Sequence, residues 1–343
     1  MIIEKLREND EKAWEDFVVK SKEATFFHQI GWKKVVEKVY GDRLKAIYLI
    51  AEDRGKFRGI LPLFLCNNWP FGRKLISLPL ASCGGCCTDS EAADVMLINK
   101  AIELANAFDV DYLELRNIDE KKGDFLTNKA YLTLVLDLDP APENLWSGFR
   151  ETTRRYIRKA TRNNLEVTIA TKDIGDFYKI YSQNQRNLGT PVQSYRWIKS
   201  VFFDFPGHHA IARVRYQGKT IAAIFLRTFR DQMMYVFGAS LPEYRNLYPN
   251  YILFWKILQD ACKRGFKQFD FGRSLQNSGS YFFKVGWGAK PEQYYYQYYL
   301  NRANNIPDTS QANSKRIMFA KLWKRLPLPM ANTLGPMIRR YYQ

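Results

Sequence analysis

The feature that most constrains the fold is a weak internal repeat, which relates the two halves of the 343-residue chain. Three pairs of segments resemble one another in the same order: 31–41 with 196–207, 55–63 with 218–226, and 112–117 with 268–274. The offset between partners changes only slowly, from 165 to 163 to 156 residues. Chance similarity rarely preserves both order and spacing, so the repeat predicts a duplicated domain.

Hydrophobic periodicity predicts the same succession of elements in each half. In the second half we expect helices over 174–187 and 194–203, a hairpin of strands 209–216 and 220–228, a strand over 233–238, a helix over 249–263 and a strand over 266–271. The first half has a matching late helix over 92–108 and a strand over 112–117. The sequence therefore predicts an α/β (α+β) protein with two domains of like topology, each containing a mixed sheet.

The segment Pro140-Ala-Pro142 is the expected linker between the domains. We therefore predict a first domain over 1–140, a second over 141–300 and a basic C-terminal tail over 301–343. The tail carries eight Lys and Arg against one Asp, interleaved with Ile317, Met318, Leu322 and Trp323. This amphipathic pattern is typical of a segment that lies on an anionic membrane surface, or of one that packs back onto the protein.

The charge balance favours polyanionic partners. Lys and Arg number 52 against 35 Asp and Glu, which gives a formal net charge of +17. No apolar run approaches the roughly 18 residues that a membrane-spanning helix needs. The charged N-terminus has no apolar signal-peptide core. We therefore expect a cytoplasmic protein, with the tail allowing peripheral contact at the inner face of the membrane.

The cysteines do not indicate a disulfide scaffold or a metal site. Three of the five lie in Cys83-Gly84-Gly85-Cys86-Cys87, and the remaining two are distant in sequence. His28, His208 and His209 are the only histidines, and none has metal-ligand spacing. We expect no metal and no permanently bound cofactor. The glycine-containing loop is interpreted as a packing turn, with a phosphate cradle before helix 92–108 as the alternative.

A cluster of basic residues opens the second domain. Arg150, Arg154, Arg155, Arg158, Lys159 and Arg162 lie within 13 residues, opposed only by Glu151. Most of them share one face of a predicted helix. Such a face suits contact with nucleic-acid or lipid phosphates, for which Arg155 and Arg158 are the candidate residues, or it is simply solvated.

Several motifs resemble the FemAB family of acyl and aminoacyl transferases. The run Phe269-Asp-Phe-Gly-Arg-Ser274, followed by Gly279-Ser-Tyr-Phe-Phe-Lys-Val-Gly-Trp-Gly288, is similar to the end of that family's second domain. Arg155-Tyr-Ile-Arg-Lys-Ala160 resembles the entry to that domain, and Phe26-Phe-His-Gln-Ile-Gly-Trp32 resembles the opening of the first. The tail 323–336 is similar to a narrower branch that is associated with exosortase/PEP-CTERM exopolysaccharide systems.

The resemblance implies two tandem N-acetyltransferase-like domains and transfer of an acyl or aminoacyl group to an amine. The acceptor that it implies is a cell-envelope or exopolysaccharide precursor. Well-studied relatives use aminoacyl-tRNA as donor, and some carry a long helical hairpin for the tRNA. This sequence has no obvious hairpin of that kind, so acyl-CoA and an acyl carrier protein remain alternative donors.

The chemistry of aminolysis points to a few side chains in the motif of residues 269–288. The reaction needs a neutral amine, a stabilised oxyanion and a proton for the leaving group, and backbone amides where two strands splay can supply part of this. Lys284 interrupts an aromatic stretch. The resemblance implies that it stabilises the reacting ester or binds the acceptor; the alternative is a solvent-facing lysine on an edge strand. Asp270 could receive or orient the amine, with local hydrogen bonds to turn amides as the alternative. Tyr281 could protonate the leaving group, with a tyrosine of the core as the alternative.

Three further residues complete the predicted substrate-binding set. Arg273 could clamp a phosphate or carboxylate, with a surface salt bridge as the alternative. Arg245 lies in the loop before helix 249–263, where a donor phosphate would sit, although this loop has no glycine cradle. His28 lies in the family-like opening and is expected either to line a cleft between the domains or to be a satisfied structural histidine.

Two non-catalytic functions remain open at this stage. One is a protein that binds a polyanion such as RNA through the basic residues 150–162. The other is a peripheral membrane protein that acts through its tail.

Overall fold

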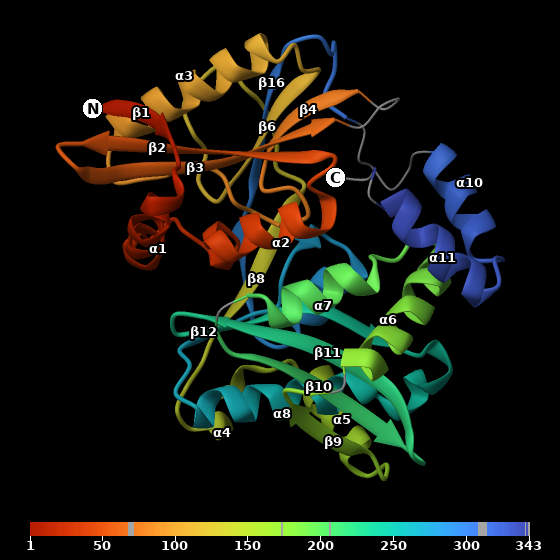
Figure 1. Cartoon of the computed structure of the whole chain (residues 1–343). Coiled ribbons are helices and arrows are strands. Elements are labelled where there is room, and N and C mark those ends of the chain that lie inside the picture. The colour runs from red at the N-terminus through yellow and green to blue at the C-terminus, as the bar shows by residue number, and fades with distance from the viewer. Residues whose placement is uncertain (68–71, 173, 206, 308–313, 340, 342–343) are drawn as a thin grey trace. The chain divides into compact units, whose positions relative to one another are not determined.

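A computed structural model describes residues 1–67, 72–172, 174–205, 207–307, 314–339 and 341. The chain forms two compact units, each built on a mixed sheet (Figure 1). The first unit contains Met1–Tyr131 together with a segment that starts at Gln293. The second contains Leu132–Glu292 together with the two C-terminal helices.

The first unit has a sheet in the order β1-β2-β3-β4-β6-β16-β7, with β5 paired to β3. These strands are β1 (Ile2–Lys5), β2 (Leu44–Asp53), β3 (Lys56–Asn67), β4 (Arg73–Ser77), β5 (Cys87–Thr88), β6 (Tyr112–Asn117), β7 (Leu126–Asn128) and β16 (Tyr295–Leu300). The pair β4 and β6 is parallel, because the helix α3 (Glu91–Ala107) connects them as a crossover.

Alternation along β2 explains how helices cover both faces of this sheet. Ile47 and Leu49 belong to the cluster that packs under α3. The intervening Tyr48 points the other way and packs on Trp14 of α1 (Glu11–Lys20), with 4.9 Å between ring centroids. Helix α2 (Ile30–Tyr40) buries Trp32 on the same side as α1.

The second unit repeats this plan, with the order β14-β8-β13-β12-β11-β10-β9 and β15 paired to β8. Its strands are β8 (Tyr131–Asp137), β9 (Glu166–Ala170), β10 (His209–Tyr216), β11 (Lys219–Phe229), β12 (Gln232–Ser240), β13 (Gln268–Asp270), β14 (Ser274–Leu275) and β15 (Lys290–Gln293). The pair β12 and β13 is parallel, with α8 (Pro249–Lys263) as the crossover.

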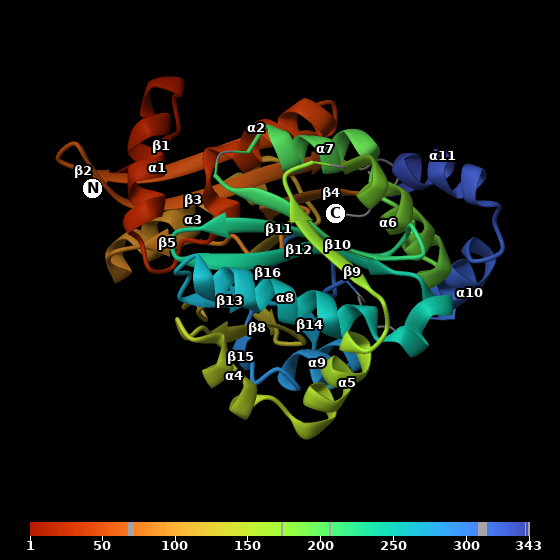
Figure 2. The same ribbon diagram turned by 90° about the horizontal axis from the view of Figure 1, so that it is seen from below.

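Alternation on β11 again separates two helical layers. Ile224 and Leu226 share a cluster with Leu253 of α8, and α5 (Glu151–Thr161) packs on α8. The intervening Phe225 contacts Phe177 of α6 (Ile174–Leu188) on the other face. Helix α7 (Tyr195–Phe203) lies beside α6, and short helix α4 (Pro142–Gly148) lies beside α8 (Figure 2).

The repeated topology confirms the fold predicted from the duplication. Trp32 and Trp197 lie in the second helix of their units, α2 and α7. The segments around Gly55 and Gly218 form the hairpins β2–β3 and β10–β11. The segments that start at Tyr112 and Gln268 form the two strands that pair in parallel, β6 and β13.

Two strands belong to the other unit from the one that the sequence predicted. β8 lies within the predicted first domain but joins the sheet of the second unit, and β16 lies within the predicted second domain but joins the sheet of the first unit. β8 pairs with β13, with Leu136 opposite Phe269. β16 pairs with both β6 and β7, with Tyr296 opposite Arg116 and Asn128. The boundaries of the units therefore lie at Tyr131 and Gln293, and differ from the predicted domains 1–140, 141–300 and 301–343.

The C-terminal helices pack onto the second unit. Both α10 (Ser314–Trp323) and α11 (Leu328–Arg339) lie near α6 (Figure 1). Trp323 is buried, and a Cβ on Gly335 would come within 2.9 Å of the backbone nitrogen of Val192. Part of the predicted amphipathic tail therefore packs back on the protein. Within the described residues, the helices fall short of the length and apolarity that crossing a bilayer requires.

Candidate active site

The candidate site begins where β12 and β13 separate. Their parallel pairing ends at Met234 and Asp270, whereas β12 continues to Ser240. A register shift in β12, opposite Phe225 and Leu226, bends the strand at the same level. Beyond Met234 the edge of β12 is no longer paired with β13, so backbone amides on this edge can bind another group.

Asp270 occupies the last paired position of β13. Its Oδ1 accepts hydrogen bonds from Thr133 Oγ1 at 2.5 Å and from the backbone N–H of Gly272 at 2.7 Å. Burial raises the pKa of this carboxyl group, while the two hydrogen bonds and Lys284 act in the opposite direction. The carboxylate is thus oriented, and it binds a proton more readily than an exposed aspartate.

The turn after Asp270 requires glycine. Gly272 has a φ of +74°, and a Cβ there would lie 3.1 Å from the carbonyl oxygen of Tyr235 on β12. The turn directs the carbonyl groups of Gly272 and Arg273 toward the next helix. These carbonyls are the groups that position the lysine.

Lys284 lies near the end of α9 (Gly279–Val285), not on an edge strand as the alternative interpretation held. Its side chain is buried, and Nζ donates to the carbonyl oxygens of Gly272 at 2.6 Å and Arg273 at 3.1 Å. Burial lowers the pKa of Lys284 to about 8; Asp270 opposes this shift and Arg273 adds to it. An ammonium group has three N–H donors, and two carbonyls engage two of them.

The position of α9 depends on two contacts with the start of α5. The carbonyl oxygen of Gly286 accepts hydrogen bonds from the backbone N–H of Arg150 and from Thr153 Oγ1, both at 2.9 Å. Trp287, which follows, is fully buried and packs against Phe149 at 5.1 Å between centroids. Helix α9, and with it Lys284, is therefore held on the core of the second unit.

Four of the predicted residues lie in one segment, and two of them, Asp270 and Lys284, are close enough to interact electrostatically. Asp270, Arg273, Tyr281 and Lys284 all lie in the segment from β13 to α9. Tyr281 precedes Lys284 by three positions and so lies on a neighbouring part of the same helix surface. The side chain of Arg273 is exposed, while its carbonyl group binds the lysine.

The other predicted residues lie elsewhere. Arg245 is exposed in the 3-10 helix Pro242–Leu247, before α8. Arg155 and Arg158 are exposed on α5, where Arg158 pairs with Glu151 at 3.3 Å. The basic face that was predicted for residues 150–162 therefore forms, at the surface of the second unit.

His28 has a structural place in the first unit. The residue is buried, and its Nδ1 lies 3.0 Å from the backbone nitrogen of Thr25. Its Nε2 lies 3.1 Å from both the carbonyl oxygen of Gly85 and the Sγ of Cys87. These contacts correspond to the satisfied structural histidine, so the structure does not support the substrate-binding role expected for His28.

Two polar residues of the site were missed by the sequence analysis. Thr133 reaches Asp270 from β8, a strand that precedes it by more than a hundred residues. Glu292, on β15, lies close enough to Asp270 for the two carboxylates to repel each other, and partial desolvation together with this repulsion raises the pKa of Glu292. The one sequence signal for Thr133 is a hydroxyl within the otherwise apolar run Leu132–Leu136.

In the first unit, the carboxylate at the position equivalent to Asp270 is already held in a buried ion pair. Glu114 aligns with Asp270 in the repeat and likewise occupies the last parallel pair of its strand. Its carboxylate is bound by Arg116 Nε at 2.6 Å, and both side chains are buried. Arg116 stands where the second unit has Gly272, so this unit lacks the turn that presents carbonyl groups to Lys284.

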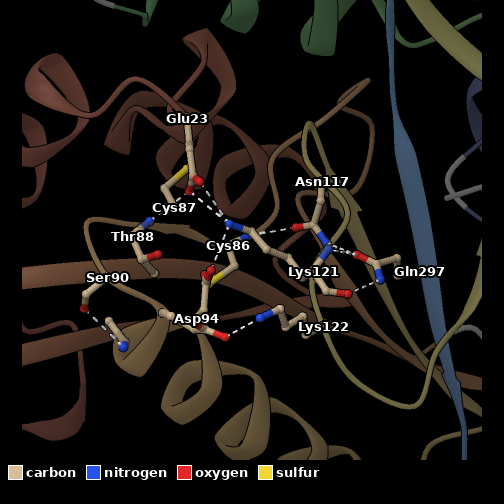
Figure 3. A network of polar contacts seen from close by, with 12 residues as sticks. Glu23, Cys86, Cys87, Thr88, Ser90, Asp94, Asn117, Lys121, Lys122 and Gln297 are labelled. Carbon is tan, nitrogen blue, oxygen red and sulfur yellow. Dashed lines mark hydrogen bonds and ion pairs between the residues drawn. The ribbon is translucent and has the colours of Figure 1, made fainter.

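A second polar network in the first unit surrounds Lys121 (Figure 3). Its Nζ lies 3.0 Å from Glu23 and 3.2 Å from Asp94, and these two carboxylates outweigh burial and raise the pKa of the lysine. Gln297 of β16 binds both the N–H and the carbonyl group of Lys121, at 2.9 and 2.8 Å. The network ties the inserted strand β16 to the loop after β6.

A pocket of about 450 Å³ adjoins this network. Six carboxylate residues contribute to its lining, against Lys121 and Lys122. A surplus of negative charge disfavours a phosphate ligand there.

The loop Cys83–Cys87 is a packing turn rather than a phosphate cradle. Its five residues are buried, and the backbone N–H of Gly84 donates to the carbonyl oxygen of Arg116 at 2.9 Å. The backbone N–H of Cys86 donates to Asn117 Oδ1 at 3.0 Å. Burial raises the pKa of the Cys86 and Cys87 thiols, which makes them poor nucleophiles. All five cysteines are buried thiols that form no disulfide.

Residues 147–285 match the sequence family described as "Acetyltransferase (GNAT) domain". Over these residues the second unit is similar to a GNAT acetyltransferase domain. The match includes both Asp270 and Lys284, and the repeated topology extends the same architecture to the first unit. The fold is thus a tandem of N-acetyltransferase-like domains. No curated protein matches the chain significantly in sequence.

The chain is similar to several solved structures with the same architecture, and in three of them the similarity covers nearly the whole of the other protein's chain. A crystal structure of FemX has a TM-score of 0.69 and 14% identity, over 88% of this chain and 98% of that one. The C-terminal domain of a putative lysylphosphatidylglycerol synthetase from Agrobacterium fabrum has a TM-score of 0.57 and 14% identity, over 84% of this chain and 91% of that one. A tandem GNAT protein from the clavulanic acid biosynthesis pathway has a TM-score of 0.53 and 10% identity, over 87% of this chain and 97% of that one.

Proposed function

We propose that this protein is a transferase that moves an acyl or aminoacyl group to an amine, and that the second unit performs the chemistry. The observation that carries the proposal is the buried Lys284 ammonium group. It is held by the carbonyl groups of Gly272 and Arg273, in electrostatic contact with Asp270, where β12 and β13 separate. The GNAT-like match supports the same unit.

Each side chain has a role that its environment favours. Asp270 accepts a proton from the attacking amine, because burial makes the carboxylate a better base than an exposed one. Lys284 directs its remaining N–H toward the carbonyl oxygen of the donor and stabilises the oxyanion, together with amides of β12. Tyr281 donates a proton to the leaving oxygen or sulfur atom.

The donor class that we propose is an ester or thioester on a large anionic carrier: acyl-CoA, an acyl carrier protein or aminoacyl-tRNA. Exposed Arg245 before α8, and Arg155 and Arg158 on α5, offer positive charge on the second unit to such a carrier. The net charge of +17 supports the same class.

The acceptor that we propose is an amine of a cell-envelope or exopolysaccharide precursor, encountered in the cytoplasm. The resemblance of the motifs and of the tail 323–336 to FemAB-like proteins of exopolysaccharide systems supports this class. The names of the structural neighbours do not converge on one substrate, since one is a lysylphosphatidylglycerol synthetase domain and another belongs to clavulanic acid biosynthesis.

The test is transfer of a labelled group from each of the three donors to amine acceptors, with folded variants as controls. Lys284→Met and Asp270→Asn should each lower kcat/KM by about 100-fold or more. The matched variants Lys290→Met and Asp137→Asn change an exposed ion pair of the same unit and should retain the rate. Unchanged turnover in the first two variants would refute the site.

The rival function is non-catalytic RNA binding through α5. It would be indicated by failure of all donors, together with RNA affinity that falls steeply with salt and is lost in Arg155→Glu/Arg158→Glu.

A further inference from the structure

The C-terminal helices α10 and α11 expose more apolar surface than their packing requires. Six large apolar side chains on them are between 38 and 61% exposed. On α11 these are Met330, Leu334 and Met337, at spacings of four and three residues, which places them on one face. On α10 they are Ile317, Met318 and Leu322.

This exposure is not the result of detachment from the protein. Trp323 and Ala331 are buried, Phe319 stacks on Trp323 at 5.4 Å, and Arg186 of α6 donates to the carbonyl oxygen of Lys324 at 3.3 Å. Each helix therefore has an inner side that packs on the second unit. The outer side of α11 is mainly apolar, and that of α10 carries apolar and basic side chains together.

The charge around this apolar surface is entirely of one sign. Residues 314–339 contain no Asp or Glu. Exposed basic side chains lie on α10 and in the turn that follows it: Arg316, Lys321, Lys324 and Arg325. The helices have 10 and 12 residues, too short to span a bilayer but sufficient to lie in its interface.

From this geometry we propose that α10 and α11 form a docking surface for an anionic lipid bilayer. The exposed Met, Leu and Ile side chains enter the boundary between headgroups and acyl chains, and the Lys and Arg side chains bind lipid phosphates. A bilayer fits better than a protein partner, because exposed apolar side chains bordered only by positive charge match a surface that is anionic outside and apolar within. The surface would bring the second unit to the membrane, where lipid-linked substrates reside.

The experiment is cosedimentation of the full chain with vesicles of phosphatidylcholine, with and without phosphatidylglycerol, at low and high salt. We expect binding only to the anionic vesicles, weakened by salt. Neutralising three charges in Lys321→Gln/Lys324→Gln/Arg325→Gln should lower the partition coefficient on the order of 100-fold. Met318→Glu/Met337→Glu should lower it at least about tenfold, because apolar insertion is lost.

Matched controls separate this surface from a general effect of charge or exposed apolar groups. Val19→Glu/Leu126→Glu changes residues of similar exposure on the first unit, and Arg155→Gln/Arg158→Gln/Lys159→Gln removes three charges from α5. Both controls should bind vesicles as the unaltered protein does. Two results would overturn the proposal. One is binding to neutral vesicles that is as strong as binding to anionic vesicles. The other is a loss of vesicle binding in the controls as large as that in the tail variants, when all of these variants melt at the same temperature. Neither result depends on whether the protein transfers acyl groups.

Discussion

At the scale of single residues, Lys284 differs from an ordinary lysine because its surroundings oppose its charge. Below pH 8 the folded protein must hold a buried ammonium group, which two carbonyl oxygens and Asp270 compensate in part. Such a group titrates within the range in which enzymes work, whereas an exposed lysine does not.

The pKa of Lys284 predicts how both activity and stability depend on pH. If the protonated form stabilises the oxyanion, kcat/KM should fall above about pH 8. In the unfolded chain this lysine keeps its ordinary pKa of 10.5. Between about pH 8 and pH 10.5 the unfolded chain therefore holds a proton that the folded protein has lost. The free energy of unfolding should therefore rise with pH in that window, by at most about 1.4 kcal/mol per pH unit from this group. Denaturant titrations should show that Lys284→Met loses this rise and Lys290→Met keeps it.

Thr133 should control the protonation of Asp270. Its hydroxyl donates to the carboxylate and favours the charged form, so Thr133→Val should raise the pKa of Asp270 further. In a plot of transfer rate against pH, the acidic side of the profile should then move to higher pH. Thr133→Ser keeps the hydroxyl group and should keep the acidic side in place. An identical profile for the Val variant would mean that Asp270 is not the titrating base.

At the scale of elements, the short helix α9 is positioned by glycine on either side of the site. Gly272 permits the turn that directs carbonyl groups at Lys284, and Gly286 ends the helix against Thr153. A helix of seven residues has little stability of its own, so tertiary contacts must hold it.

Gly286→Ala should therefore destabilise the second unit. Its Cβ would lie 2.8 Å from Thr153 Oγ1 and 3.0 Å from the carbonyl oxygen of Phe283. We expect a loss of roughly 1–3 kcal/mol in the free energy of unfolding. Gly279→Ala is the control at the other end of α9, where a Cβ meets nothing within 4 Å. It should be neutral, or stabilising by up to about 1 kcal/mol. Equal melting temperatures for the two variants would contradict this account.

At the scale of the whole molecule, the exchanged strands make the two units dependent on distant parts of the chain. β16 lies between β6 and β7 in the sheet of the first unit, and Gln297 binds the loop at Lys121 from there. The fragment 1–131 would thus expose the edge of β6 and leave the Lys121 loop without its partner.

We predict that the fragment 1–131 does not fold alone, and that a peptide of residues 293–307 restores its structure. Circular dichroism and protection from proteolysis provide the measurement. In the full chain, Gln297→Leu should reduce hydrogen-exchange protection in the first unit, because it leaves buried polar groups of Lys121 and Asn117 without partners. Gln293→Leu, at a partly exposed position, should have a smaller effect. A fragment that folds without the peptide would contradict this dependence of the first unit on β16.

The sequence alone determined the duplicated plan, because helical and strand periodicities are local properties that the repeat reinforces. Those patterns predicted helices over 174–187 and 249–263 and a hairpin of strands 209–216 and 220–228. The structure has them at Ile174–Leu188, Pro249–Lys263, His209–Tyr216 and Lys219–Phe229. The grouping of Asp270, Arg273, Tyr281 and Lys284 was also accessible, since all four are near in sequence. Only the tertiary structure decided that β8 and β16 exchange units, that Thr133 binds Asp270 and that Lys284 is buried on a helix. Strand partners and burial depend on contacts between residues more than a hundred positions apart, and no local pattern encodes those contacts.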